Sequence, residues 1–403
     1  MSSVLRIQLS FMMFLNYLVW GAWYVTVGTY MATSVEQGGL GFSGIQIGAV
    51  YATNAIAAII SPFFIGMVAD RFFASQRILG VLHLLGAGLM FLATQVQDYN
   101  LFYLLILLYN LTFMPSIALT NSIAFQRMEN PEQQFPAVRM FGTIGWIVIG
   151  LIVGYLAIEA TAQPLLFGAG AALFMGIYSF FLPHTPPKGK GEKVSIREIL
   201  GLDALSLMKR RDFASVIIAS VLVCIPLAFY YAWANPFLNE IGFENAAGRM
   251  TLGQVSEALF LLVMPFFFAR LGVKWMLTIG MGAWALRYLL FAYGGVGETE
   301  WMLFMGIILH GICYDFFFVS GQIYVDREAP EHLKSSAQGF ITLATYGLGM
   351  FIGSNVSGYI AGANEIGEKH DWYPIWIWPA IFAAVVLALF FVGFRQQKKE
   401  VAV

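Results

Sequence analysis

The side chains of this chain that could do chemistry lie inside apolar stretches. His310 and Asp315 stand within a membrane-length apolar run from Trp301 to Val325. An acid at the centre of a helix in lipid costs roughly 2.5–3.5 kcal/mol even on lenient insertion scales. A chain keeps such a residue where it faces a partner, water or a ligand, so Asp315 is the first functional candidate.

A second acid, Glu257, lies in another apolar stretch, with Gln254 three residues earlier on the same helical face. Desolvation raises the pKa of a carboxyl group, so a buried acid can bind and release a proton near neutral pH. The alternative for Glu257 is a position close enough to an interface for its charge to reach water. Because buried carboxylates are costly and titratable, we favour proton coupling through Asp315 or Glu257.

Aromatic and hydrogen-bonding side chains accompany the acids. Arg139, Thr143 and Trp146 recur at i, i+4 and i+7, which places a cation, a hydroxyl and an aromatic ring on one helical face. Tyr314 directly precedes the first acid, and Tyr231 lies deeper than an interfacial aromatic belt needs. Stacking faces beside hydrogen-bonding groups suit a ligand with a flat ring and hydroxyls, such as a nucleoside or a sugar.

Several of these residues also have a structural explanation. The alternative for Arg139, as for Glu257, is a position close enough to an interface for its charge to reach water. Thr143 and Gln254 are able to join helices by hydrogen bonds within a bilayer. Trp146 and Tyr314 are able to pack as ordinary aromatic residues. Another intramembrane cation, Arg287, is expected to be a structural ion-pair partner.

The composition excludes several classes of protein. The chain has 403 residues, of which 59% are hydrophobic and 11% charged, against roughly a quarter charged in a soluble domain. A net charge of −1 provides no basic face for nucleic acid. The sequence contains no Walker A or HExxH motif, and its two cysteines and five histidines lack metal-ligand spacing, so we expect neither an enzyme nor a cofactor or metal site. Without an ATP-binding loop, uphill transport would draw on an ion gradient.

A membrane span needs about 20 mostly apolar residues, and this measure predicts an all-α polytopic membrane protein. The expected spans are residues 7–31, 44–69, 77–96, 100–124, 137–159, 163–183, 213–238, 250–271, 275–294, 301–325, 337–361 and 374–394. An even number of spans places both termini on the same side. Lys and Arg are concentrated in alternate connections and near the C-terminus, so the positive-inside rule places both termini in the cytoplasm.

The polar segment 184–212 divides these twelve spans into six and six. Gly145 and Gly154-Tyr155 recur 204 positions later as Gly349 and Gly358-Tyr359. Such an echo favours a duplicated six-helix unit, the arrangement of alternating-access carriers. We therefore expect an N-terminal bundle over 1–183, a cytoplasmic linker over 184–212 and a C-terminal bundle over 213–403.

The loop after the second span reads GMVADRFFASQR and resembles the Gly-x-x-x-Asp-Arg signature of the major facilitator superfamily. Gly66 would allow close helix approach, while Asp70 and Arg71 would pair charges at a helix end and latch one conformation. The alternative is a polar turn at the lipid headgroups. We favour the gating role because the loop stands at the position expected for it.

Longer motifs extend the resemblance. They include WGAWYVTVGTYM, FPAVRMFGTIGW and SLMKRRD in the first part of the chain, and SEALFLLVMPFFFARLGVK, DFFFVSGQIYV and SSAQGFI in the second. In order and spacing these motifs are similar to those of the bacterial nucleoside:proton symporter family, over nearly the whole chain. The resemblance implies two pseudo-symmetric six-helix bundles with a nucleoside between them. It implies substrate contacts from the residues already singled out: Arg139, Thr143, Trp146, Gln254, Glu257, Tyr314 and Asp315.

Two departures concern selectivity. Ala228 and Tyr231 occupy places where the family pattern has a Gln and an Asn, and His310 replaces a Tyr. The lost amides should alter contacts to base or ribose, and Asn235 is a candidate to compensate. We count Tyr231 and His310 among the substrate-binding residues.

The sequence therefore predicts a bacterial inner-membrane carrier that imports nucleosides with protons and acts as a monomer. Its partners would be the nucleoside, protons and the lipid bilayer. A proton-coupled sugar or polyol symporter of the same superfamily is the first alternative. A carrier-derived membrane receptor that moves no substrate is the second.

Overall fold

The computed structural model describes residues 2–64, 73–186 and 201–394. The expected gating residues Gly66, Asp70 and Arg71, and residues 187–200 of the expected linker, lie outside the described residues.

The first six spans are helices whose ends follow local sequence signals. The side chain of Asp98 caps the fourth by accepting a hydrogen bond from the Leu101 amide at 2.9 Å. Asn130 caps the fifth, with a proline at its first position. The elements are α1 (Ser3–Gly21), α2 (Val27–Ala32), η1 (Val35–Gln37), α3 (Gly44–Phe64), α4 (Ser75–Ala93), α5 (Tyr99–Arg127), α6 (Pro131–Leu156) and α7 (Gln163–Ser179).

The second six spans follow a short 3-10 helix at the end of the linker. A two-stranded hairpin, β1 (Glu365–Ile366) with β2 (Lys369–His370), precedes the last span. The other elements are η3 (Leu202–Lys209), α9 (Arg211–Glu240), α10 (Ala246–Tyr293), α11 (Glu300–Ile308), α12 (His310–Tyr314), η4 (Asp315–Val319), α13 (Ser320–Glu328), η5 (Glu331–Leu333), α14 (Lys334–Thr342), η6 (Leu343–Gly349), α15 (Met350–Ala363) and α16 (Trp372–Gly393).

The expectation of twelve spans agrees with this helix order. Nine of the helices in the described ranges are long and apolar enough to cross a membrane. One of them, α10, contains two of the expected spans, separated at Gly272, whose backbone is left-handed (φ 68°). The shorter α7 and the segments from α14 to α15 supply the remaining two.

Spans ten and eleven are interrupted helices. In span ten, α11 and α12 are separated at Leu309, and the π-helical segment η4 follows. In span eleven, the π-helical segment η6 separates α14 from α15. Such interruptions are rare in α-helices and are frequent at functional sites.

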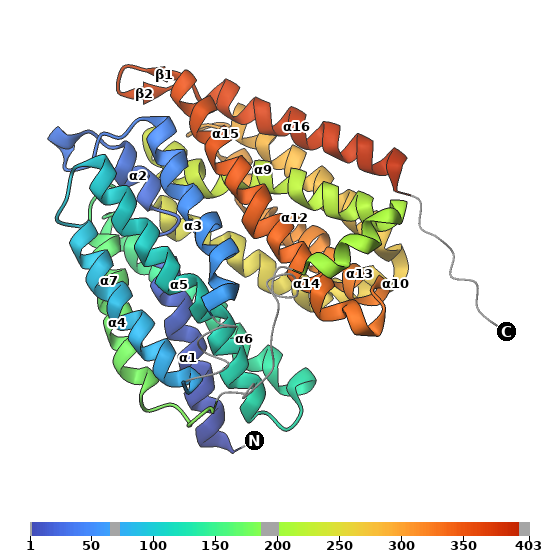
Figure 1. Ribbon diagram of the computed structural model, residues 1–403. Helices are drawn as coiled ribbons and strands as arrows, with labels where there is room; N and C mark the ends of the chain where they lie inside the picture. The colour runs from blue at the N-terminus through green and yellow to red at the C-terminus, as the bar shows by residue number, and fades with distance from the viewer. Residues whose placement is uncertain (1, 65–72, 187–200, 395–403) are drawn as a thin grey trace.

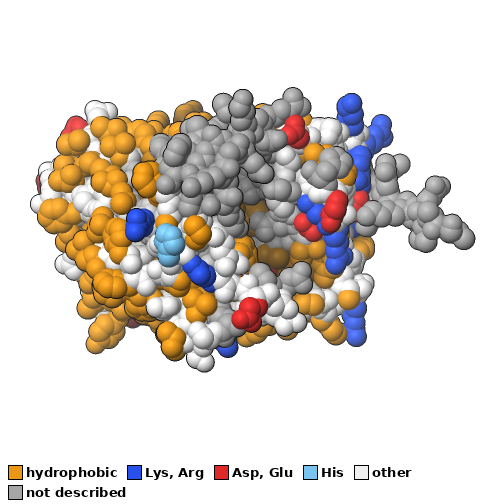
Figure 2. All heavy atoms as spheres, turned by 60° about the horizontal axis from the view of Figure 1, so that its bottom comes forward, with side chains coloured by type: hydrophobic (Ala, Val, Ile, Leu, Met, Phe, Trp, Pro, Cys, Tyr) orange, Lys and Arg blue, Asp and Glu red, His pale blue; other side chains and the backbone are white. Residues whose placement is uncertain are grey.

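Figure 1 shows two helical bundles, α1–α7 on one side and α9–α16 on the other, which meet near the β-hairpin and diverge away from it. We call the side with the hairpin the hairpin face, and the side where α1 begins and α16 ends the terminal face. Figure 2 shows a recess near the middle of the terminal face, with hydrophobic side chains visible inside it.

The bundles cross closely at two symmetry-related pairs of glycines near the hairpin face. A Cβ on Gly154 of α6 would collide with the backbone of Gly248 of α10, and one on Gly44 of α3 with the backbone of Gly358 of α15. Gly248 and Gly358 lie 204 positions after Gly44 and Gly154. The crossings are therefore related by the same internal repeat, as expected for pseudo-symmetric bundles.

Candidate functional site

The Glu257 carboxylate lies beside an imidazole from a different span. Its Oε2 is 3.7 Å from Nε2 of His310, the first residue of α12. The imidazole lies between two rings, at 5.3 Å from Tyr230 and 5.8 Å from Tyr314, each inclined by 25°. The Glu257 side chain is 27% exposed and that of His310 only 3%, so the acid is the accessible member of the pair.

Asp315 follows this stack at the start of η4. The residue is 1% exposed, and its Oδ2 has no hydrogen-bond partner among the described residues. Span ten thus places an imidazole, a phenol and an acid within six consecutive residues, and the helix is interrupted on both sides of the imidazole–phenol pair.

Tyr346, a residue that the sequence analysis did not select, belongs to the same region. It lies in η6, and its hydroxyl forms a hydrogen bond with the hydroxyl of Tyr314. The π-helical segment η6 is therefore connected to the last residue of α12, directly before η4. A single tyrosine in an apolar run carries no signal that could have identified it beforehand.

The first bundle contributes the helical face predicted on α6. The guanidinium of Arg139 lies 4.0 Å above the ring of Tyr17 of α1. One turn further on, Thr143 is half-buried. Trp146, also half-buried, packs edge-on against Trp20 of α1, with ring centroids 5.4 Å apart.

A row of aromatic rings connects the two bundles. Trp20 packs against Tyr24 and Tyr24 against Tyr231, each pair with centroids 5.4 Å apart. Tyr231 in turn lies 6.0 Å from Tyr230, the ring that stacks on the imidazole. The aromatic residues predicted from the two halves, Trp146 and Tyr231, therefore belong to one continuous surface.

Comparisons with known proteins agree with this arrangement. Residues 3–399 match the family model described as the nucleoside H+ symporter. This chain belongs to that family. The symporter is 44% identical to YegT, a candidate nucleoside transporter of Escherichia coli K12, over 98% of this chain and 95% of YegT. It is 32% identical to the xanthosine permease of the same bacterium, over 97% and 96%.

A crystal structure of the nucleoside transporter NupG superposes on the symporter with a TM-score of 0.89, at 32% identity, covering 98% of this chain and all of NupG. The major facilitator fold is thereby confirmed. Proton-coupled nucleoside import, expected from the sequence, is confirmed at the level of the family.

Two residues considered for selectivity are engaged elsewhere in the symporter. Asn235, the candidate to compensate for a lost amide, accepts a hydrogen bond from Thr29 at 2.5 Å and donates one to Glu159 at 2.7 Å in this conformation. Ala228 is buried against Gly353 of α15. Gln254, by contrast, is half-buried on the same helical face as Glu257.

Glu159, an acid that is 4% exposed in the connection after α6, was not predicted from the sequence. Its carboxylate accepts hydrogen bonds from the second bundle: from Asn235, from Asn239 at 2.5 Å and from the Ala247 amide at 2.8 Å. An acid at the end of an expected span resembles any solvated loop residue in sequence. Its burial comes from the approach of the other bundle.

The expectation for Arg287 was wrong. Within the described ranges no carboxylate forms an ion pair with this fully buried cation. Its guanidinium lies 4.0 Å above the ring of Tyr230 and donates to backbone carbonyls instead. Aromatic rings and carbonyl dipoles stabilise a buried guanidinium without a counter-charge.

Proposed function

We propose that this symporter binds its nucleoside between the two bundles, against the aromatic surface and the Glu257–His310 pair. The observation that carries this proposal is that pair, flanked by stacked rings on the imidazole. Flat rings with hydrogen-bonding groups at their edges match a nucleobase and a ribose.

The proposed roles follow from side-chain chemistry. Asp315 and Glu257 are the candidates for the coupled proton, because they are the two acids of the site. A second set holds hydroxyls or base edges: Arg139, Thr143 and Gln254. A third set stacks on the base or borders it: Trp146, Tyr231, His310 and Tyr314.

The orientation and architecture are proposed from charge and from the helix order. We assign the terminal face to the cytoplasm, because Lys and Arg are concentrated in the connections on that side of the expected spans. Residues 1–183 and 213–403 would move as two units joined by the linker 184–212. The protein would act as a monomeric carrier, not an enzyme, in the bacterial inner membrane.

A proton gradient supplies enough energy for uptake. Each proton that moves down a membrane potential of ~100 mV contributes about 2.3 kcal/mol. At about 1.36 kcal/mol per decade, this supports a nucleoside gradient of roughly fiftyfold.

The decisive experiment is uptake of radiolabelled uridine and adenosine into proteoliposomes containing the purified protein. An inward proton gradient should drive accumulation above the external concentration, and a protonophore should abolish it. Competition by unlabelled uridine, adenosine, xanthosine, ribose and maltose would follow. Nucleosides should compete and the two sugars should not.

Two results would refute the proposal. Competition by ribose or maltose as strong as that by nucleosides would favour the sugar symporter. Binding of nucleoside without any flux across the vesicle membrane would favour the receptor.

A further inference from the structure

The fully buried guanidinium of Arg287, in the second half of α10, is directed at the backbone of span ten. Its Nε donates to the Gly306 carbonyl oxygen at 2.7 Å and its Nη2 to that of Ile307 at 3.3 Å. Nη1 has no hydrogen-bond partner among the described residues. A fully desolvated cation that uses its donors on another helix's carbonyl groups restrains that helix strongly.

The two carbonyl groups belong to the turn of α11 that precedes the interruption at Leu309. The next carbonyl oxygen, that of Ile308, accepts a hydrogen bond from the Ser256 hydroxyl at 2.5 Å. Side chains from α10 thus occupy three consecutive carbonyl groups at this interruption. Interrupted helices with backbone groups held by neighbouring helices are typical of substrate sites in carriers.

The same guanidinium also supports the side chain that follows the interruption. It lies 4.0 Å from the centroid of Tyr230, the ring that also stacks on His310 at 5.3 Å. Arg287, Tyr230, His310 and Tyr314 therefore form one column, which we call the arginine column. Arg287 lies outside the proposed site. Within the arginine column it contacts the backbone directly before His310 and the Tyr230 ring that stacks on His310.

We propose that Arg287 is a positioning residue that sets the nucleoside selectivity of the symporter by fixing His310 and Tyr314. This inference rests on the proposed substrate site. Arg287 does not touch the substrate: it holds the backbone at the interruption and the ring beneath the imidazole. Movement of either group would displace the imidazole relative to Glu257 and change which base edges fit.

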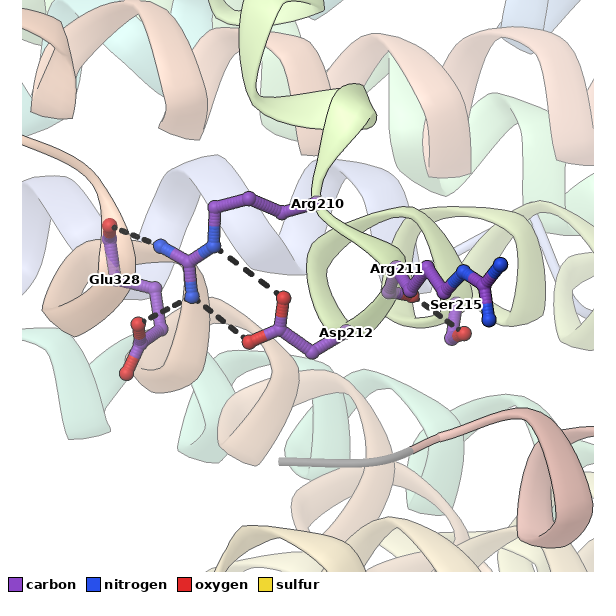
Figure 3. Close-up of polar contacts among 5 residues, drawn as sticks. All are labelled: Arg210, Arg211, Asp212, Ser215 and Glu328. Atoms are coloured by element: carbon purple, nitrogen blue, oxygen red, sulfur yellow. Dashed lines mark hydrogen bonds and ion pairs between the residues drawn. The ribbon is translucent and has the colours of Figure 1, made fainter. Parts of the chain in front are cut away.

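Two other arginines hold the ends of span ten and show what a purely structural arginine does there. Arg249 forms an ion pair with Glu300, at the start of α11, at 2.9 Å. At the other end, Figure 3 shows Arg210 between the carboxylates of Asp212 and Glu328, at 2.7 and 2.6 Å. The hydrogen bond with Asp212, followed by the contact with Glu328, raises the pKa of Arg210. Both arginines have carboxylate partners and lie outside the arginine column.

The first test compares Arg287→Gln and Arg287→Lys with the matched control Arg249→Gln. KM and the maximal rate would be measured for uridine and adenosine in proteoliposomes. We expect Arg287→Gln to change the ratio of the two KM values by about fivefold or more, and the control to change it less than about twofold. Arg287→Lys keeps the charge but loses the fork, so its ratio should lie between those of wild type and Arg287→Gln.

A double-mutant cycle separates positioning from general destabilisation. If Arg287 acts through His310, adding Arg287→Gln to His310→Ala should change the KM ratio by less than about twofold. A purely structural role predicts a lower maximal rate and less folded protein with an unchanged KM ratio, and that outcome would overturn the proposal.

A second variant is available if Arg287→Gln does not fold. Tyr230→Leu removes the ring and leaves both carbonyl contacts of Arg287. An unchanged KM ratio in Tyr230→Leu would also overturn the proposal.

Hydrogen exchange provides a readout that does not depend on nucleoside transport. In Arg287→Lys, the amides of residues 309–314 should exchange roughly tenfold faster than in wild type, and those in the Arg249→Gln control should not. Unchanged exchange contradicts the positioning role even if nucleosides are transported. If wild type accumulates no nucleoside, the proposed function is refuted. Faster exchange in Arg287→Lys would still show that Arg287 restrains span ten.

Discussion

At the scale of single residues, the two acids of the site differ in their surroundings. Glu257 is partly exposed and has His310 beside it, whereas Asp315 is buried with one oxygen lacking a donor. An ionised carboxylate without hydrogen bonds in such a place costs several kcal/mol, and a protonated one costs much less. The geometry therefore favours Asp315 as the acid that is protonated in this conformation.

The first prediction concerns Asp315→Asn, which keeps the shape of the side chain and removes its titration. Accumulation driven by the proton gradient should be lost, while exchange of labelled for unlabelled nucleoside should persist. Glu257→Gln should instead raise KM, because this acid lies next to the proposed base-binding stack. Proteoliposome uptake and counterflow measure both effects. The assignment fails if counterflow is lost along with accumulation in Asp315→Asn, or if Glu257→Gln alone uncouples transport.

A second prediction at this scale concerns Tyr231, whose ring connects Tyr24 with the arginine column. Tyr231→Phe should transport nucleosides with a KM within about twofold of wild type, because the stacking face is kept. Tyr231→Asn restores the amide expected from the family pattern and should shift preference between purine and pyrimidine nucleosides. Competition of five nucleosides against labelled uridine measures the shift. An identical competition order in both variants and wild type would show that this ring does not select the base.

At the scale of elements, the spans were predictable and their interruptions were not. Apolar runs of about 20 residues identify the spans because the hydrocarbon core of the bilayer requires that length. Buried acids can be recognised because placing them in lipid costs free energy. The interruption at Leu309 depends on donors from Arg287 and Ser256, which come from another helix and leave no local pattern in the sequence. The hydrogen bond between Tyr346 and Tyr314 was not predictable either, because its two partners come from different spans.

A third prediction tests that pairing. Tyr346→Phe removes the hydrogen bond between η6 and the end of α12 and keeps the ring. A net loss of about 0.5–1.5 kcal/mol should raise KM roughly two- to tenfold. The matched control is Tyr359→Phe in the same span, since that tyrosine is 67% exposed. Equal KM values in the two variants would show that the pairing does not shape the site.

At the scale of the whole molecule, the bundles are joined at the hairpin face. Between described residues, the recorded hydrogen bonds from one bundle to the other all lie near that face. They are the three bonds to Glu159, the Thr29–Asn235 bond and a bond from the Gly44 amide to Glu365 at 2.7 Å. Together with the two glycine crossings, they close this face while the terminal face is recessed (Figure 2). Alternating access requires these contacts to break as the opposite face closes.

The last prediction follows from the position of Glu159, which supplies three of those five bonds. Glu159→Ala removes both acceptor oxygens. It should shift the equilibrium between the closed and open forms of the hairpin face toward the open form by about tenfold or more, since hydrogen bonds to a charged group contribute ~1.5–3 kcal/mol each.

Spin labels on Glu36→Cys and Glu368→Cys would report the distance across the hairpin face, and both native cysteines are buried. Glu298→Ala, at an exposed acid on the same side, is the charge-matched control. We expect a longer-distance population in Glu159→Ala alone. If the distance distributions of the two variants coincide, the glycine crossings close the hairpin face without help from the carboxylate.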